Sequence, residues 1–142
     1  MVQAVLDFHG QNPADWRACI NYLHKSFGYD RYPVIVHIIP NAGVVVMALL
    51  YSRGDFARAV QIATMAGWDT DCNAGNVGAI MGVAVGLEGI EARWRAAMND
   101  LLIGASLSGA RNLTDIASVA GRIADCGAQR AGIATTRRAR LH

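Results

Sequence analysis

Charged residues are scarce in this sequence. Only 17% of the 142 residues are charged, whereas 53% are hydrophobic, and about 25% charged is typical of soluble domains. So few charges leave apolar surface on a small domain, and we expect another chain, or a further part of the same protein, to cover it. The net charge of +2 excludes the strong electrostatic attraction of a nucleic-acid or membrane-surface binder, so neither is expected as a partner.

Cysteine is also rare, with three residues at wide spacing. They are Cys19, Cys72 and Cys126. An odd number without a pattern excludes a disulfide framework and predicts a cytoplasmic protein. The start of the chain mixes Asp7 and His9 with apolar residues, which is unlike a signal peptide.

No apolar stretch reads as a membrane span. Residues 34–51 are long enough, but His37, Pro40 and Asn41 interrupt them. Residues 74–87 are fewer than the roughly 20 that a bilayer requires. Both stretches are therefore interpreted as buried helices.

Helical spacing of apolar residues predicts an all-α fold, a compact helical bundle. Capping and stop signals place helices at 12–28, 41–54, 55–67, 73–87, 91–98 and 114–127. Residues 29–39 are rich in aromatic and β-branched types and could be extended, but no set of strands is apparent. We predict one helical domain over 1–128 and a basic, flexible tail over 129–142, which holds the arginines Arg130, Arg137, Arg138 and Arg140.

Three glycines spaced by four residues lie in the helix predicted for 73–87. Gly78, Gly82 and Gly86 share one face of that helix. Because glycine in a helix interior costs about 1 kcal/mol, we expect another backbone to approach closely here. This predicts the central helix of a tight bundle.

Two carboxylates stand one residue apart between apolar helices. In an extended segment the side chains of Asp69 and Asp71 would point to one side and converge on a hard cation. The alternative is that both cap the following helix, whose dipole favours negative charge. A calcium-binding EF-hand is excluded, because Ala74 and Ile80 replace the required Gly and Glu.

The run from Gly67 to Ile80, Gly-Trp-Asp-Thr-Asp-Cys-Asn-Ala-Gly-Asn-Val-Gly-Ala-Ile, resembles the C-terminal metal motif of ADP-ribosylglycohydrolases. This is the family of the dinitrogenase reductase-activating glycohydrolase. Three neighbouring segments agree in order. They are His37–Ala42, resembling His-x-x-Pro-Asn-Ala; Gly54-Asp55-Phe56, resembling Gly-Asp-Phe; and Gly86–Ile90 followed by Trp94.

The resemblance implies a helical hydrolase with a binuclear Mg²⁺ or Mn²⁺ site. Such enzymes cleave the glycosidic bond between ADP-ribose and a modified side chain, so ADP-ribose or an ADP-ribosylated substrate is the implied ligand. By position Asp69 and Asp71 would be metal ligands, and Cys72 stands where the family often has threonine. Because a thiol is a poor ligand for a hard cation, the side chain of Asn73 or a water is the alternative third ligand.

The family's other metal ligands lie in an N-terminal Thr-Asp-Asp type motif, and this chain contains no Asp-Asp pair. The sequence therefore predicts only half of the metal site, as in a fragment, a degenerate product or one half of a split assembly. The alternative is a non-catalytic helical module that self-associates, as a homo-oligomer or with a complementary chain.

Three further residues are candidates for substrate binding. His37 and Asn41 would lie near the cleft, but a buried, hydrogen-bonded histidine and an N-cap asparagine are the interpretation we favour. Trp68 could wall the cleft or belong to the core. The Cys72 thiol, at a helix N-terminus, could have a lowered pKa. Cys19 and Cys126 are expected to be buried helix residues.

Overall fold

In the computed structural model the chain divides into two compact units, Met1–Glu91 and Ala92–His142, and each is described by itself. The structure describes residues 1–33, 35–105, 107, 109 and 112–134. Seven α-helices and one two-stranded sheet are found among them, which confirms the all-α prediction. The tail predicted for 129–142 is wrong at its start, because Arg130 is the last residue of a helix; Arg137, Arg138 and Arg140 lie outside the described residues. A single domain over 1–128 stays a prediction.

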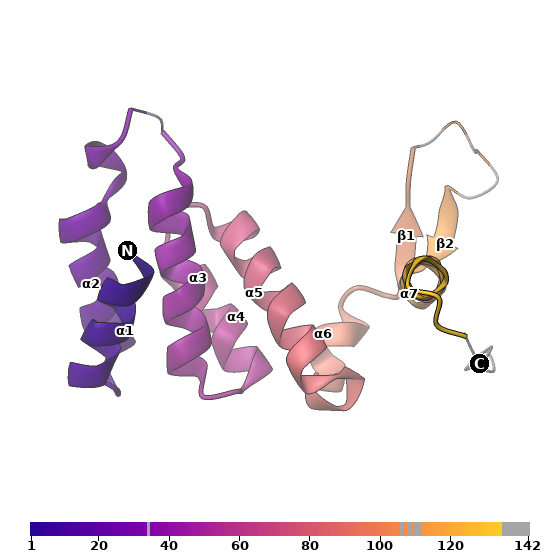
Figure 1. Ribbon diagram of the computed structural model, residues 1–142, viewed down its shortest axis with the longest axis horizontal. Helices are drawn as coiled ribbons and strands as arrows, with labels where there is room; N and C mark the ends of the chain where they lie inside the picture. The colour runs from indigo at the N-terminus through magenta and orange to yellow at the C-terminus, as the bar shows by residue number, and fades with distance from the viewer. Residues whose placement is uncertain (34, 106, 108, 110–111, 135–142) are drawn as a thin grey trace. The chain divides into compact units, whose positions relative to one another are not determined.

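Five α-helices build the first unit (Figure 1). They are α1 (Val2–Gln11), α2 (Trp16–Phe27), α3 (Ile38–Ser52), α4 (Phe56–Met65) and α5 (Thr70–Val85), with 3-10 turns η1 (Tyr29–Arg31) and η2 (Leu87–Gly89). No helix among the described residues is long and apolar enough to cross a bilayer.

Local capping bonds mark where three helices of this unit, α2, α3 and α4, begin. The carboxylates of Asp15 and Asp55 each accept a hydrogen bond from the backbone N–H three residues later in the chain, as predicted for Asp55. Asn12 was expected to start the first helix but instead ends α1, a helix that the sequence analysis did not predict. Asn41 was expected to cap α3, but α3 begins three residues earlier, because the His37 side chain accepts from the N–H of Ile39.

The core of the first unit gathers around α3, which contacts α1, α2, α4 and α5. Its buried face carries Val44, Met47, Ala48 and Tyr51. The prediction that α5 is the central helix is wrong, because only Asn73, Val77 and Met81 of α5 are buried.

The expected close approach to the glycines of α5 is also absent among the described residues. A Cβ on Gly78 would meet Val60 at 3.9 Å and one on Gly82 would meet Ile90 at 3.8 Å, both ordinary contacts. The tighter place is Gly43 of α3, where a Cβ would meet a methyl of Leu23 at 3.1 Å. The glycine that lets two helices approach therefore lies on α3.

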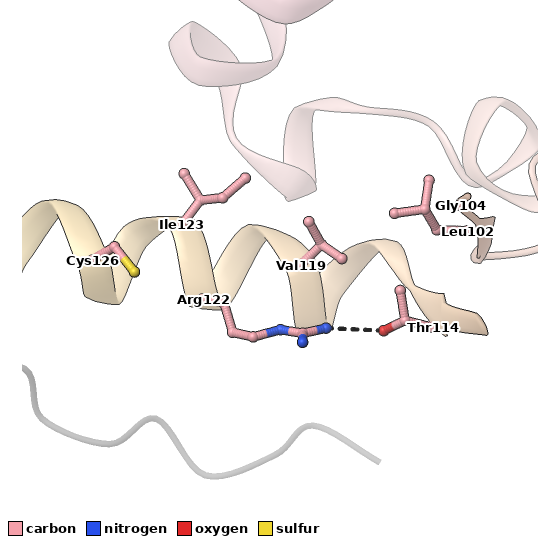
Figure 2. Close-up of a pocket in the computed structure, with 7 residues that line it drawn as sticks. All are labelled: Leu102, Gly104, Thr114, Val119, Arg122, Ile123 and Cys126. Atoms are coloured by element: carbon pink, nitrogen blue, oxygen red, sulfur yellow. Dashed lines mark hydrogen bonds between the residues drawn. The ribbon is translucent and has the colours of Figure 1, made fainter. Parts of the chain in front are cut away.

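The second unit consists of α6 (Ala92–Ala96), the antiparallel strands β1 (Leu101–Ile103) and β2 (Leu113–Asp115), and α7 (Ile116–Arg130). This small hairpin was not predicted. Asp115 caps α7 as expected, and an open apolar groove of about 400 Å³ lies along the helix (Figure 2). None of the described residues of this unit is buried. Cys126 is exposed and Cys19 buried, so the prediction of burial holds only for Cys19.

Candidate metal site at the start of helix α5

A tight turn between α4 and α5 delivers the two candidate carboxylates. Gly67 and Trp68 both have positive φ angles, of 79° and 60°, and α5 begins at Thr70. For a tryptophan this left-handed backbone is unusual and costs about 1–3 kcal/mol. The Trp68 ring compensates by packing against His24, at 4.3 Å between centroids, and Tyr29, at 5.0 Å. Trp68 is half-buried in this aromatic cluster.

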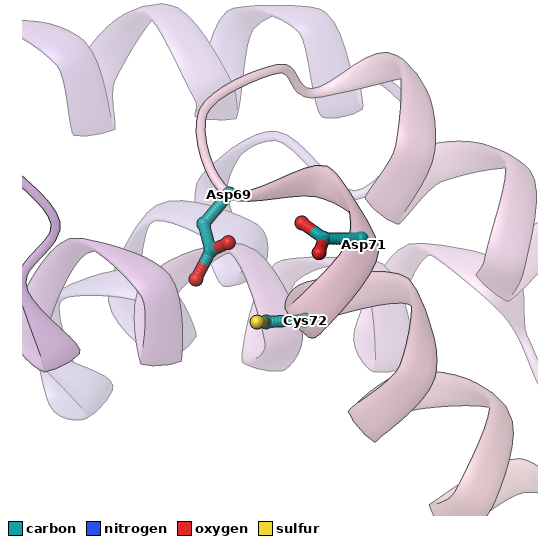
Figure 3. A group of neighbouring side chains, drawn as sticks. All are labelled: Asp69, Asp71 and Cys72. Atoms are coloured by element: carbon teal, nitrogen blue, oxygen red, sulfur yellow. The ribbon is translucent and has the colours of Figure 1, made fainter.

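The side chains of Asp69, Asp71 and Cys72 converge (Figure 3). One ligand atom from each lies within 4.8 Å of the others. The prediction that the two carboxylates converge from an extended segment is wrong, because Asp71 lies in the first turn of α5. Asp69 and Cys72 instead meet because residues three apart share one face of a helix turn.

Asp69 stands at the N-cap position of α5, but its side chain makes no capping bond there. Its Oδ2 accepts a hydrogen bond of 2.8 Å from the Nδ2 of Asn41. The capping interpretation therefore does not describe Asp69. Its carboxylate is held by a side chain 28 residues earlier in the chain.

Asn41 is buried, with 8% of its surface exposed, and its Oδ1 accepts a hydrogen bond from the Tyr29 hydroxyl. Sequence analysis had given Asn41 two roles, cleft residue or N-cap, and the structure places it beside the carboxylates without a capping role. Tyr29 was missed altogether. No signal in the sequence could have found it, because it lies in a turn that resembles no motif.

The electrostatics of the cluster act on Cys72 and Tyr29. The pKa of the Cys72 thiol is raised, first by its hydrogen-bonding interaction with Asp69 and then by the charges of Asp69 and Asp71. The expectation of a lowered pKa is therefore wrong, since the two neighbouring carboxylates disfavour the thiolate. Burial is the main cause of a raised pKa at Tyr29, and the charge of Asp69 adds to it.

Asn73, the alternative third ligand, follows directly in α5. Its side chain is 1% exposed, and neither polar atom of its amide has a hydrogen-bond partner among the described residues. An unpaired buried amide is uncommon and costs about 1–3 kcal/mol. Among the described residues, Asn73 is therefore a buried polar side chain, directly after Cys72 in the sequence, whose hydrogen-bonding capacity is unused.

The described contacts of His37 are with Ile39 and Tyr32 and not with the carboxylates. Its Nδ1 accepts from the Ile39 N–H at 3.2 Å, and its ring stacks on Tyr32 at 4.2 Å between centroids. His37 is half-buried rather than fully buried. Its described contacts are those of a helix cap.

The sequence was compared with protein families, curated proteins and solved structures. A family model described as ADP-ribosylglycohydrolase matches residues 1–131. The match extends well beyond the segment from His37 to Trp94 that carries the motifs. No curated protein and no solved structure matches the chain.

Proposed function

The chain belongs to the ADP-ribosylglycohydrolase family, and on this premise we propose that it binds Mg²⁺ or Mn²⁺ through Asp69 and Asp71 and acts on ADP-ribosylated substrates. The proposed reaction is hydrolysis of the glycosidic bond to ADP-ribose. The observation that carries the proposal is the convergence of the two carboxylates within 4.8 Å. Two carboxylates at this separation repel one another, and a cation relieves that repulsion.

The donor groups present fit a hard cation in part. Carboxylate oxygens are the preferred ligands of a hard cation, and the unpaired amide of Asn73 has a further oxygen of a type that such cations bind. The Cys72 thiol suits a hard cation less. When bound, the cation would act as a Lewis acid and orient water and ribose hydroxyls. Asp69 and Asp71 would hold it, and Trp68 would wall the cleft beside them.

The first test is a calorimetric titration of Mn²⁺ into the full chain. Asp69→Asn and Asp71→Asn keep the side-chain volume and remove one charge each, so both are expected to abolish binding. Asp125→Asn, an exposed acid of α7, is the matched control and should bind like the unchanged chain. Binding that survives in both site variants would refute the metal site.

The second test is of the reaction. Release of free ADP-ribose from an ADP-ribosylated peptide is measured by chromatography with Mn²⁺ present. We expect the unchanged chain to release ADP-ribose and the Asp69→Asn variant to release none. Metal binding without release would restrict the function to ligand binding by a half site.

A specific observation also favours the second candidate, a self-associating module. Large apolar side chains are exposed along α5 and the turn after it, with Ile80 at 48%, Val83 at 90% and Leu87 at 55%. Such a patch predicts a dimer or larger oligomer in analytical ultracentrifugation. Val83→Glu is expected to shift it toward monomer. A clean monomer of the unchanged chain at high concentration would rule this candidate out.

A further inference from the structure

We propose that Tyr29 and Asn41 form a positioning relay that orients the Asp69 carboxylate for the cation. The inference rests on the proposed metal site and adds two residues that lie outside the Gly67–Ile80 run. The relay joins three elements, since Tyr29 begins η1, Asn41 lies in the first turns of α3, and Asp69 precedes α5. Each member contacts the next through one hydrogen bond.

The direction of each hydrogen bond follows from chemistry. An ionised carboxylate only accepts, so the amide nitrogen of Asn41 must face Asp69. The amide oxygen of Asn41 then faces Tyr29, and the Tyr29 hydroxyl must donate to it. The carboxylate therefore selects which way the amide is turned, and the Tyr29 hydroxyl stabilises that orientation by donating to the amide oxygen. A reversed amide would place its oxygen against the carboxylate and repel it.

The Asp69 carboxylate has two oxygens, of which one accepts from Asn41 and the other is left for the cation. Asp69 Oδ2 accepts from Asn41, and one oxygen of the carboxylate lies within 4.8 Å of the candidate ligand atoms of Asp71 and Cys72. Fixing one oxygen sets the plane in which the other is presented. Partners of this kind, behind a metal ligand, typically change metal affinity by about 10- to 100-fold when removed.

Burial makes the relay rigid. Asn41 is 8% exposed, so water cannot readily replace either of its partners. Tyr29 is further held by its ring contact with Trp68, at 5.0 Å between centroids. Removing the hydroxyl while keeping the ring therefore isolates the hydrogen bond from the packing.

The test measures the Mn²⁺ dissociation constant of the full chain and three variants by calorimetry. Asn41→Ala is expected to weaken binding by about 10- to 100-fold. Tyr29→Phe is expected to weaken it by about three- to tenfold, the effect of one neutral hydrogen bond. Because Tyr29 acts through Asn41, adding Tyr29→Phe to Asn41→Ala should change nothing further.

Tyr51→Phe is the matched control, since this tyrosine also donates a buried hydrogen bond, of 2.7 Å, but to the Asn12 carbonyl oxygen. It should lower the melting temperature and leave Mn²⁺ affinity unchanged. If Asn41→Ala does not fold, Tyr29→Phe alone decides. Equal affinity in Tyr29→Phe and the unchanged chain would overturn the relay, whereas no Mn²⁺ binding by the unchanged chain would overturn the proposed function and the relay together.

Discussion

The two units of the chain differ in how they use apolar residues. The first unit, Met1–Glu91, buries a cluster that includes Leu23, Met47 and Tyr51, each at most 1% exposed. The second unit has apolar residues of similar type, but Ile103 is 72% exposed and Ile123 is 68% exposed. The difference lies in the number of packed layers. A hairpin with α6 and α7 does not enclose a side chain from all sides, whereas the four helices packed around α3 do.

This difference explains why the candidate site lies in the first unit. A hydrogen bond between distant side chains needs a rigid frame, and Asn41 gains it from the buried face of α3. The second unit has a groove lined by residues that include Arg122 and Thr114, and the Arg122 side chain donates a hydrogen bond to the Thr114 hydroxyl. This hydrogen bond is exposed to solvent. A packed core is therefore the condition for holding a carboxylate in one orientation.

The sharpest way to break this comparison is to truncate one large residue in each unit. Leu23→Ala removes a fully buried side chain and is expected to lower the free energy of unfolding by about 2–5 kcal/mol. Ile123→Ala, at an exposed position, should change it by less than about 0.5 kcal/mol. Urea unfolding followed by circular dichroism measures both. A large effect of Ile123→Ala would mean that something covers the second unit.

Cation binding should stabilise the first unit. At free Mn²⁺ about 100 times its dissociation constant, the free energy of unfolding should rise by about 2.7 kcal/mol. Differential scanning calorimetry with and without Mn²⁺ measures the shift in melting temperature. Asp71→Asn should abolish the shift and Asp125→Asn should keep it. A shift that persists in Asp71→Asn would locate the cation elsewhere.

Alkaline pH should also act on the first unit. Burial raises the pKa of the Cys19 thiol from 9.0 to about 11, and burial also raises the pKa of Tyr51. The unfolded chain therefore loses these protons first, so stability is full below pH 9 and falls as pH rises toward 11. The loss from Cys19 is on the order of 2 kcal/mol. Urea unfolding at pH 8 and pH 11 measures it.

Two variants test the source of that pH dependence. Cys19→Ala should reduce it, because the raised thiol pKa is removed. Cys126→Ala, which changes an exposed thiol, should leave it as it was. The same pH dependence in both variants would show that Cys19 is not its origin.

The smallest expected effect compares two helix caps. Asp55→Ala removes a 2.7 Å bond to the Arg58 N–H and should lower the free energy of unfolding by about 1 kcal/mol. Asp115→Ala removes the equivalent bond to Ser118. It should reduce amide protection in α7 alone, as measured by hydrogen exchange. Equal protection losses in α3 and α7 on Asp115→Ala would show that the two units unfold together.

Much of the helical framework could be predicted because it depends on neighbours in sequence. Gly28 ends α2, Asp55 starts α4 and Asp115 starts α7 as their residue types indicate. The failures came where two local signals compete. Asn12 and Asn41 are both good caps by type, yet Asp15 and His37 take that role, and periodicity alone does not choose between them.

The sequence by itself determined the all-α class, the family and the two carboxylates, because capping chemistry and an ordered set of motifs are written in contiguous residues. Only the tertiary structure decided that α3 is central and that Asn41 links Tyr29 to the Asp69 carboxylate. These contacts join residues on separate elements. They depend on how helices pack in three dimensions, and packing is set by many weak contacts that no short stretch of sequence contains.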